Sequence, residues 1–126
     1  MTRRKNYMFD GIDHVQIAAP KGSEDECREF FSKILGMKEI PKPENLKKRG
    51  GVWFQCGTHE LHIGIQENFI PAIKAHPAFS ISDINKLKQR LIENNIKIKE
   101  DEPLEGATRF YVNDPFGNRL EFLQRH

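Results

Sequence analysis

The sequence has few cysteines and no long apolar run, and each shortage excludes a class of protein. Only Cys27 and Cys56 carry thiols among the 126 residues. Two thiols are too few for a disulfide framework or a four-cysteine zinc site, so we expect both to be buried free thiols of a cytoplasmic protein. No apolar run approaches the roughly 20 residues that cross a bilayer, so no membrane partner is expected.

The sequence also lacks an excess of one charge. Its 20 Lys and Arg residues face 18 Asp and Glu residues, which leaves a net charge of +2. This balance does not predict a nucleic-acid partner, and the basic clusters at 3–5 and 47–49 have no interleaved aromatic residues and are expected to be solvated. The basic N-terminus is not followed by the apolar stretch of about 7–15 residues that a secretory signal needs.

What is present is enough to build a core. Hydrophobic residues make up 37% of the chain and include nine phenylalanines, which is too much apolar content for a disordered protein. The length suits one ordinary domain spanning residues 1–126.

The first half of the chain, residues 9–65, is typical of a βαβββ module. Residues 11–19 alternate polar and apolar side chains and predict a strand. Residues 24–35 carry an apolar stripe at helical spacing, and Ser23 with Glu26 predicts a capping box at its start. Further strands are expected at 37–40, 51–56 and 59–65, with a polar loop over 44–50.

The second half, residues 75–124, repeats this order. A strand predicted over 75–81 leads to a helix ending near Asn94, which Ser82 or Asp83 caps. Further strands are expected at 96–99, 109–113 and 119–124.

Polar residues are placed alike in the two halves. His14 and His76 lie on the two first strands, and Glu60 and Glu121 lie on the two last strands. The shared order and the shared placement indicate a duplication. The fold class expected is therefore α+β, built from two βαβββ modules in one domain.

Three segments carry a family resemblance. GIDHVQIA at 11–18, AHPAFSISDI at 75–84 and FYVNDPFGNRLEFL at 110–123 resemble the vicinal oxygen chelate superfamily, which includes glyoxalase I, fosfomycin and bleomycin resistance proteins, methylmalonyl-CoA epimerase and extradiol dioxygenases. The resemblance covers about residues 9–124. It implies a cup-shaped pair of mixed-sheet half-barrels with the helices outside, but no single reaction, because the fold hosts many.

The resemblance also implies a metal centre. Its ligand positions fall on His14, His76 and Glu121, the last also being the candidate catalytic carboxylate, with either His62 or Glu60 as the fourth. Strand parity does not separate these two, because residues i and i+2 point the same way. Imidazoles with a carboxylate suit a divalent ion such as Zn²⁺, Mn²⁺, Ni²⁺ or Fe²⁺. Small members of the superfamily often pair, so we expect a homodimer.

Further residues are expected to face the cup and contact a small-molecule substrate. Tyr111 matches a tyrosine that contacts phosphonate in the fosfomycin enzymes, and Arg109 shares its face and could bind an anionic group. The other candidates are Trp53 and Gln16.

Two functions follow from the resemblance. One is a metal-dependent enzyme, a lyase, isomerase or thiol transferase, in which the ion polarises an oxygen of a small substrate. The alternative is a metal-free protein that binds and sequesters a small molecule such as a drug, as bleomycin resistance proteins do.

Overall fold

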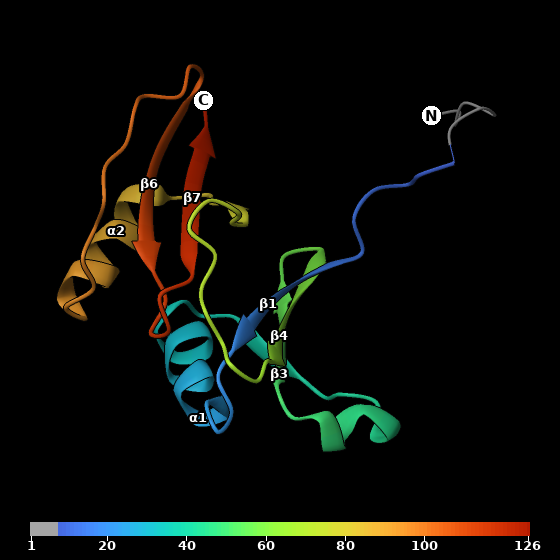
Figure 1. The fold of residues 1–126 in the computed structure, drawn as a ribbon. Helices are drawn as coiled ribbons and strands as arrows, with labels where there is room; N and C mark the ends of the chain where they lie inside the picture. The colour runs from blue at the N-terminus through green and yellow to red at the C-terminus, as the bar shows by residue number, and fades with distance from the viewer. Residues whose placement is uncertain (1–7) are drawn as a thin grey trace.

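The computed structural model describes residues 8–126, and its elements follow the predicted order with two sheets and two main helices (Figure 1). The first half contains β1 (His14–Ala19), α1 (Glu24–Cys27) continued by a π-helix (Arg28–Ile34), β2 (Lys38–Ile40), a 3-10 helix (Glu44–Arg49), β3 (Val52–Cys56) and β4 (His59–Ile65). The second half contains β5 (Ala78–Ser80), α2 (Ile84–Glu93), β6 (Ala107–Asn113) and β7 (Arg119–Arg125).

The first half forms a four-stranded sheet in the order β1-β4-β3-β2. β1 runs parallel to β4, and its register places Gln16 beside His62. β3 pairs with β4 in the antiparallel direction and places Trp53 opposite His62. The order leaves β1 at one edge of this sheet.

The second half forms a three-stranded sheet in the order β5-β7-β6. β5 runs parallel to β7, with Ala78 beside Glu121, and β6 is antiparallel to β7, with Tyr111 opposite Glu121. The two sheets thus share one plan, which confirms the mixed α+β fold.

The strand predicted over 96–99 is the main departure from that plan. Only a single bridge forms, between Lys99 and Tyr111, with both backbone hydrogen bonds at 2.8 Å. Ile96 and Ile98 produced the alternation behind the prediction, and both side chains do pack against the core. Packing against the core therefore accounts for the alternation of apolar residues, although the segment does not pair continuously with a neighbouring strand.

Two local predictions in the first half are also wrong. Ser23 occupies the N-cap position of α1, but its side chain makes no capping hydrogen bond; the residue is only 6% exposed, and its hydroxyl lies beside Cys27. The expected loop over 44–50 contains the 3-10 helix, which follows Pro43 and stops at Gly50, where φ is 76°. By contrast, Asp83 caps α2 as predicted, accepting from the Lys86 amide at 3.1 Å.

Each sheet has a helix-covered face and an opposite face. In the first sheet, Phe31 of the π-helix packs on Phe54 with ring centroids 5.7 Å apart. In the second, Phe110 lies beneath Lys88 of α2 and Phe122 is buried beside it, with ring centroids 5.6 Å apart. Because neighbouring strand residues point to opposite faces, the polar residues between these aromatics project away from the helices.

The NDPFGN turn, which lies between β6 and β7, holds the two halves together through side-chain hydrogen bonds. Asp114 accepts from the amides of Phe116 at 2.9 Å and Asn118 at 2.8 Å. Asn118 in turn donates from its side chain to Asp114 and, at 2.7 Å, to the Ala18 carbonyl of β1. This buried network fixes the start of β7 against the end of β1.

Both cysteines are free within the described chain, although only Cys27 is fully buried and Cys56 is half-buried. Burial raises the pKa of the Cys27 thiol to about 11. The reactive thiolate is therefore scarce at neutral pH.

Alkylation should report this protection. At pH 8, Cys27 is expected to react with iodoacetamide at least about 100-fold more slowly in the folded protein than in urea, since both access and thiolate are suppressed. Peptide mass spectrometry over a time course measures the two rates. Equal rates in both states would contradict the buried placement.

Across residues 8–126, no helix is both long and apolar enough to span a bilayer.

Candidate functional site

A stack of three rings lies on the open face of the first sheet. The Trp53 indole lies 3.7 Å from the His62 ring at an interplanar angle of 5°. On its other face, His62 stacks on His14 with centroids 4.1 Å apart at 17°. His62 is only 4% exposed, so both faces of its ring are covered and only its edge is open to partners.

Each of these imidazoles has one nitrogen held by a carboxylate. His62 Nε2 lies 2.9 Å from Glu60 Oε1, and His14 Nδ1 lies 2.9 Å from Asp13 Oδ2. A carboxylate accepts hydrogen bonds, so in the neutral rings the free lone pairs are Nδ1 of His62 and Nε2 of His14.

The second sheet carries a cluster around Glu121. Its Oε1 lies 2.9 Å from His76 Nε2 and accepts from the Tyr111 hydroxyl at 3.2 Å, while its Oε2 accepts from Arg109 at 3.2 Å. Arg109 also donates to Tyr111 at 3.1 Å and to the Glu102 carbonyl at 2.6 Å. The guanidinium thus ties Glu121 to the loop before β6.

The charge states in this cluster follow from its contacts. Burial by itself would raise the pKa of Glu121, but the hydrogen bonds from His76, Arg109 and Tyr111 outweigh burial and hold that pKa below its usual value of 4.5. Burial, followed by the charge of Glu121, raises the pKa of Tyr111. At neutral pH the carboxylate is therefore ionised and the phenol keeps its proton.

The strand registers make the two clusters equivalent. In the second sheet Glu121 pairs with Ala78, two residues after His76. In the first sheet, Gln16, which is two residues after His14, pairs with His62. By the same comparison, Glu60 corresponds to Arg119 rather than to Glu121.

The next strand in each sheet, β3 beside β4 and β6 beside β7, extends this equivalence. Trp53 pairs with His62, and Tyr111 pairs with Glu121. Each module thus presents three side chains in one layer: a histidine at or before the first strand, a His or Glu from the last strand, and an aromatic residue from β3 or β6.

The donor set fits a divalent cation in its chemistry. His76 Nδ1 lies 2.8 Å from the Lys74 carbonyl, which leaves Nε2 facing Glu121. Metal-binding histidines characteristically have their second nitrogen held in this way. The rings of His14 and His62, however, are stacked and nearly parallel. Because the lone pair of an imidazole lies in its ring plane, the two rings cannot both donate to one ion until one of them turns. His14, whose side chain is 44% exposed, has the room.

The two clusters do not merge within one chain. Among residues 8–126, no three His, Cys, Asp or Glu side chains gather closely enough to hold a metal ion. The chain brings His14 to His62 and His76 to Glu121, and it leaves the pairs separate.

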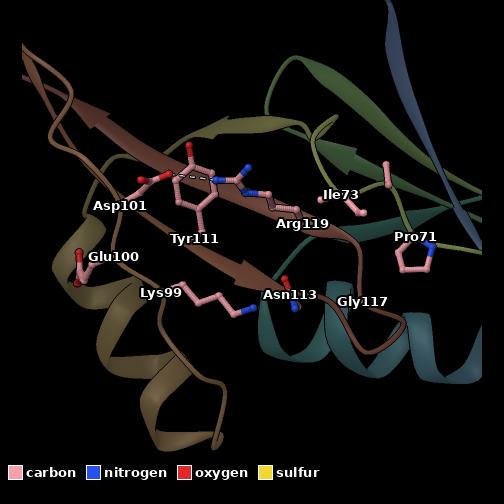
Figure 2. A pocket seen from close by; sticks show the side chains of 10 residues that line it. Pro71, Ile73, Lys99, Glu100, Asp101, Tyr111, Asn113, Gly117 and Arg119 are labelled. Carbon is pink, nitrogen blue, oxygen red and sulfur yellow. Dashed lines mark hydrogen bonds and ion pairs between the residues drawn. The ribbon is translucent and has the colours of Figure 1, made fainter.

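A cavity of about 390 Å³ adjoins the Glu121 cluster (Figure 2). The Arg119 guanidinium lies 4.1 Å above the Tyr111 ring and pairs with Asp101 at 3.1 Å. Lys99 points toward Asn113 across the floor of the cavity (Figure 2). Sequence reasoning did not select Lys99 or Arg119 for substrate contact, although Arg119 shares the strand face of Glu121.

A larger cleft of about 950 Å³ lies between β1 and β5. Gln16 is among its lining residues, and its side chain rests on Gly64, where a Cβ atom would come within 2.7 Å of the amide nitrogen. His76 and Arg119 also line this cleft. Of the predicted substrate residues, Tyr111 lines the smaller cavity and Gln16 the larger cleft, whereas Arg109 and Trp53 line neither. Arg119 borders both hollows.

Comparison with solved structures shows close relatives. A glyoxalase family protein from Bacillus anthracis is 54% identical, with a TM-score of 0.92 and coverage of 98% of this chain and 100% of that one. A glyoxalase family protein from Enterococcus faecalis is 24% identical, with a TM-score of 0.73 over 93% of this chain and 99% of its own. Lactoylglutathione lyase from Agrobacterium tumefaciens is 20% identical, with a TM-score of 0.70 over 94% and 96%.

The latter two likenesses are evidence of fold alone. No curated protein matches the chain. A family match covers residues 11–122, which spans both modules and the turn between β6 and β7. The chain belongs to the Glyoxalase/Bleomycin resistance protein/Dioxygenase superfamily.

Proposed function

We propose that the protein is a metal-dependent enzyme of the glyoxalase type acting on a small molecule. The single observation that carries this proposal is the equivalence of the two polar layers, each with two candidate ligands at matching registers. His14 and His62 from one module, with His76 and Glu121 from another, would hold a divalent ion, which supplies a Lewis acid for a substrate oxygen. One related fold, that from A. tumefaciens, is a lactoylglutathione lyase.

The separation of the layers within one chain favours a homodimer, in which the first module of one copy meets the second module of the other. The chain exposes 9138 Å², whereas a compact protein of its mass exposes roughly 7000 Å². Apolar side chains on segment 8–13 and on the connector between the sheets contribute to that surface: Met8, Phe9, Ile12, Ile70 and Ile73 are 65% to 93% exposed. Such a surface is typical of an interface.

The residues around the ligands have separate roles in this proposal. Arg109 keeps Glu121 ionised and in place. Trp53 holds the plane of the His62 ring. Tyr111 and Arg119 form a wall where an anionic part of the substrate can be bound, and Gln16 offers an amide along the larger cleft.

One observation favours the alternative, a metal-free binding protein. Both oxygens of Glu121 already accept hydrogen bonds from side chains of the same module. A buried carboxylate satisfied in this way does not require an ion.

Metal analysis and mass measurement separate the two functions. Protein purified without a histidine tag and incubated with Mn²⁺, Ni²⁺ or Zn²⁺ is expected to retain about one ion per chain after desalting, because a two-fold dimer has two equal sites. Light scattering at tens of micromolar should give twice the mass of one chain. A monomer without retained metal would instead support sequestration.

A turnover screen then addresses the substrate. Methylglyoxal–thiol adducts and fosfomycin with several thiols are the first compounds to test, each with the three ions. Turnover that disappears with EDTA and returns with one ion is the expected result.

A further inference from the structure

We propose that the cavity of about 390 Å³ beside β6 binds an oxyanion, the carboxylate or phosphoryl group of a small substrate, between the side chains of Lys99 and Arg119. The inference rests on the proposed function for what the anion belongs to, because a substrate bound there would lie next to the Glu121 cluster. Neither Lys99 nor Arg119 is a proposed metal ligand, so the cavity can be tested without a metal ion.

A pair of backbone hydrogen bonds determines the side to which Lys99 points. Its amide donates to the Tyr111 carbonyl and its carbonyl accepts from the Tyr111 amide, both at 2.8 Å. Residues paired across an antiparallel bridge point to the same face, so the Lys99 side chain shares the face of Tyr111. It points toward Asn113 across the cavity (Figure 2). The isolated bridge thus brings a cation to the open face of the second sheet.

The acidic residues that line the cavity do not neutralise Lys99. Glu100, the next residue, pairs with Lys88 of α2 at 3.0 Å, and Asp101 pairs with Arg119 at 3.1 Å. Within residues 8–126, the Lys99 ammonium itself has no carboxylate partner. An ammonium group can donate three hydrogen bonds, and those of Lys99 are available to an anion that enters the cavity.

Arg119 supplies a second cation, and its present partner holds it weakly. Its guanidinium lies 4.1 Å from the centroid of the Tyr111 ring, which keeps the side chain beside the cavity. Its ion pair with Asp101 joins side chains that are 27% and 40% exposed, and partly exposed pairs contribute little to stability. The Glu102 amide donates to Asp101 at 2.7 Å and fixes that carboxylate. Asp101 is therefore an internal competitor that an external anion can displace from Arg119.

The connector and the turn before β7 complete the walls of the cavity. Pro71 and Ile73 lie on the side opposite Tyr111 (Figure 2). Gly117 permits this approach, because a Cβ atom there would come within 3.1 Å of Pro71 Cγ. Apolar walls reduce the local dielectric and strengthen charged hydrogen bonds. The Tyr111 hydroxyl donates to Glu121 at 3.2 Å, so Tyr111 links the cavity to the Glu121 cluster.

Anion titration of the metal-free protein tests the inference. Inorganic phosphate and acetate are added separately at constant ionic strength, and the amides of Asn113 and Gly117 are followed in ¹H–¹⁵N NMR spectra. Both amides are expected to shift along saturable curves, and the anion that binds more tightly identifies the group as phosphoryl or carboxylate. If neither anion saturates these shifts, the inference is overturned.

Three variants assign the effect to particular side chains. Lys99→Met keeps an unbranched apolar stem but removes the charge, and it should weaken anion binding about 10-fold or more. Asp101→Asn removes the competitor of Arg119 and should tighten binding about threefold. Lys97→Met is the matched control, because Lys97 is exposed but lines neither hollow. Its effect should stay within about twofold, since salt screens distant charges.

Equal losses in the two lysine variants would indicate general charge attraction and overturn the inference, as would an unchanged affinity in Asp101→Asn. Metal retention is measured separately and tests the proposed function. If the protein retains no ion but binds the anions in the expected pattern, the proposed enzyme fails and the anion site remains. If it retains ions but binds neither anion, the anion site fails and the proposed enzyme remains.

Discussion

Replacing His14 by alanine is expected to weaken divalent-metal binding by at least about 100-fold, more than loss of an outer-shell partner, while the midpoint of thermal unfolding changes little. His14 lies on the edge strand β1 with its side chain 44% exposed, so its removal leaves no large cavity in the core. Isothermal titration with Mn²⁺ and differential scanning calorimetry measure the two quantities.

His59→Ala is the matched control. His59 is also an exposed histidine of the first sheet, and its ring contacts the Thr58 hydroxyl at 3.2 Å. Its replacement should leave metal affinity unchanged, which separates a specific ligand from general histidine binding. Similar losses in both variants would contradict the assignment of His14.

Glu121→Ala should lose both metal binding and stability. In this variant Arg109, Tyr111 and His76 would all lose an acceptor. Losing these three side-chain hydrogen bonds at once is expected to lower the free energy of unfolding more than His14→Ala does, although Arg109 keeps its bonds to the Glu102 carbonyl and the Tyr111 hydroxyl. Urea denaturation of the metal-free variants of His14 and Glu121 compares the two cases.

Replacing Gly51 by alanine is expected to cause a large loss of stability. Gly51 has a φ of 90°, and a Cβ atom there would lie 2.2 Å from the Ile63 carbonyl oxygen. That oxygen belongs to the backbone of a central strand, so it cannot move aside as a side chain can. Backbone strain and the clash together should lower the free energy of unfolding by roughly 3 kcal/mol or more.

Gly106→Ala controls for backbone conformation alone. Gly106 has a φ of 79°, but no atom lies within 4 Å of the position of its missing Cβ. The cost there should be about 1 kcal/mol, the strain of a left-handed residue. Urea denaturation of both variants measures the difference, and equal losses would show that the close approach at Gly51 is not the cause.

Much of the fold could be predicted from local patterns in the sequence. Alternation along 11–19 and 119–124 assigned faces to β1 and β7, because side chains in a strand point to opposite sides in turn. It also placed Glu121 opposite the buried neighbours Leu120 and Phe122. The repeated order of elements indicated two modules before any contact was known.

Local patterns failed where packing decided between alternatives. Ile96 and Ile98 alternate as a strand would, yet their burial comes from the core and only Lys99 forms a bridge. Ser23 has the residue type of a helix cap, but it is buried beside Cys27. In both cases tertiary contacts outweighed a preference worth about 1 kcal/mol.

The sequence by itself determined which residues share one face of each sheet, because a strand period of two fixes the side of each residue. It did not distinguish His62 from Glu60, which share that side. The tertiary structure separated them, because the pairing of β1 with β4 aligns His62 with the position of Glu121. Only the tertiary structure showed that, within residues 8–126, the His14–His62 and His76–Glu121 pairs do not join into one cluster, since the distance between two modules depends on how their sheets pack and not on their strand patterns.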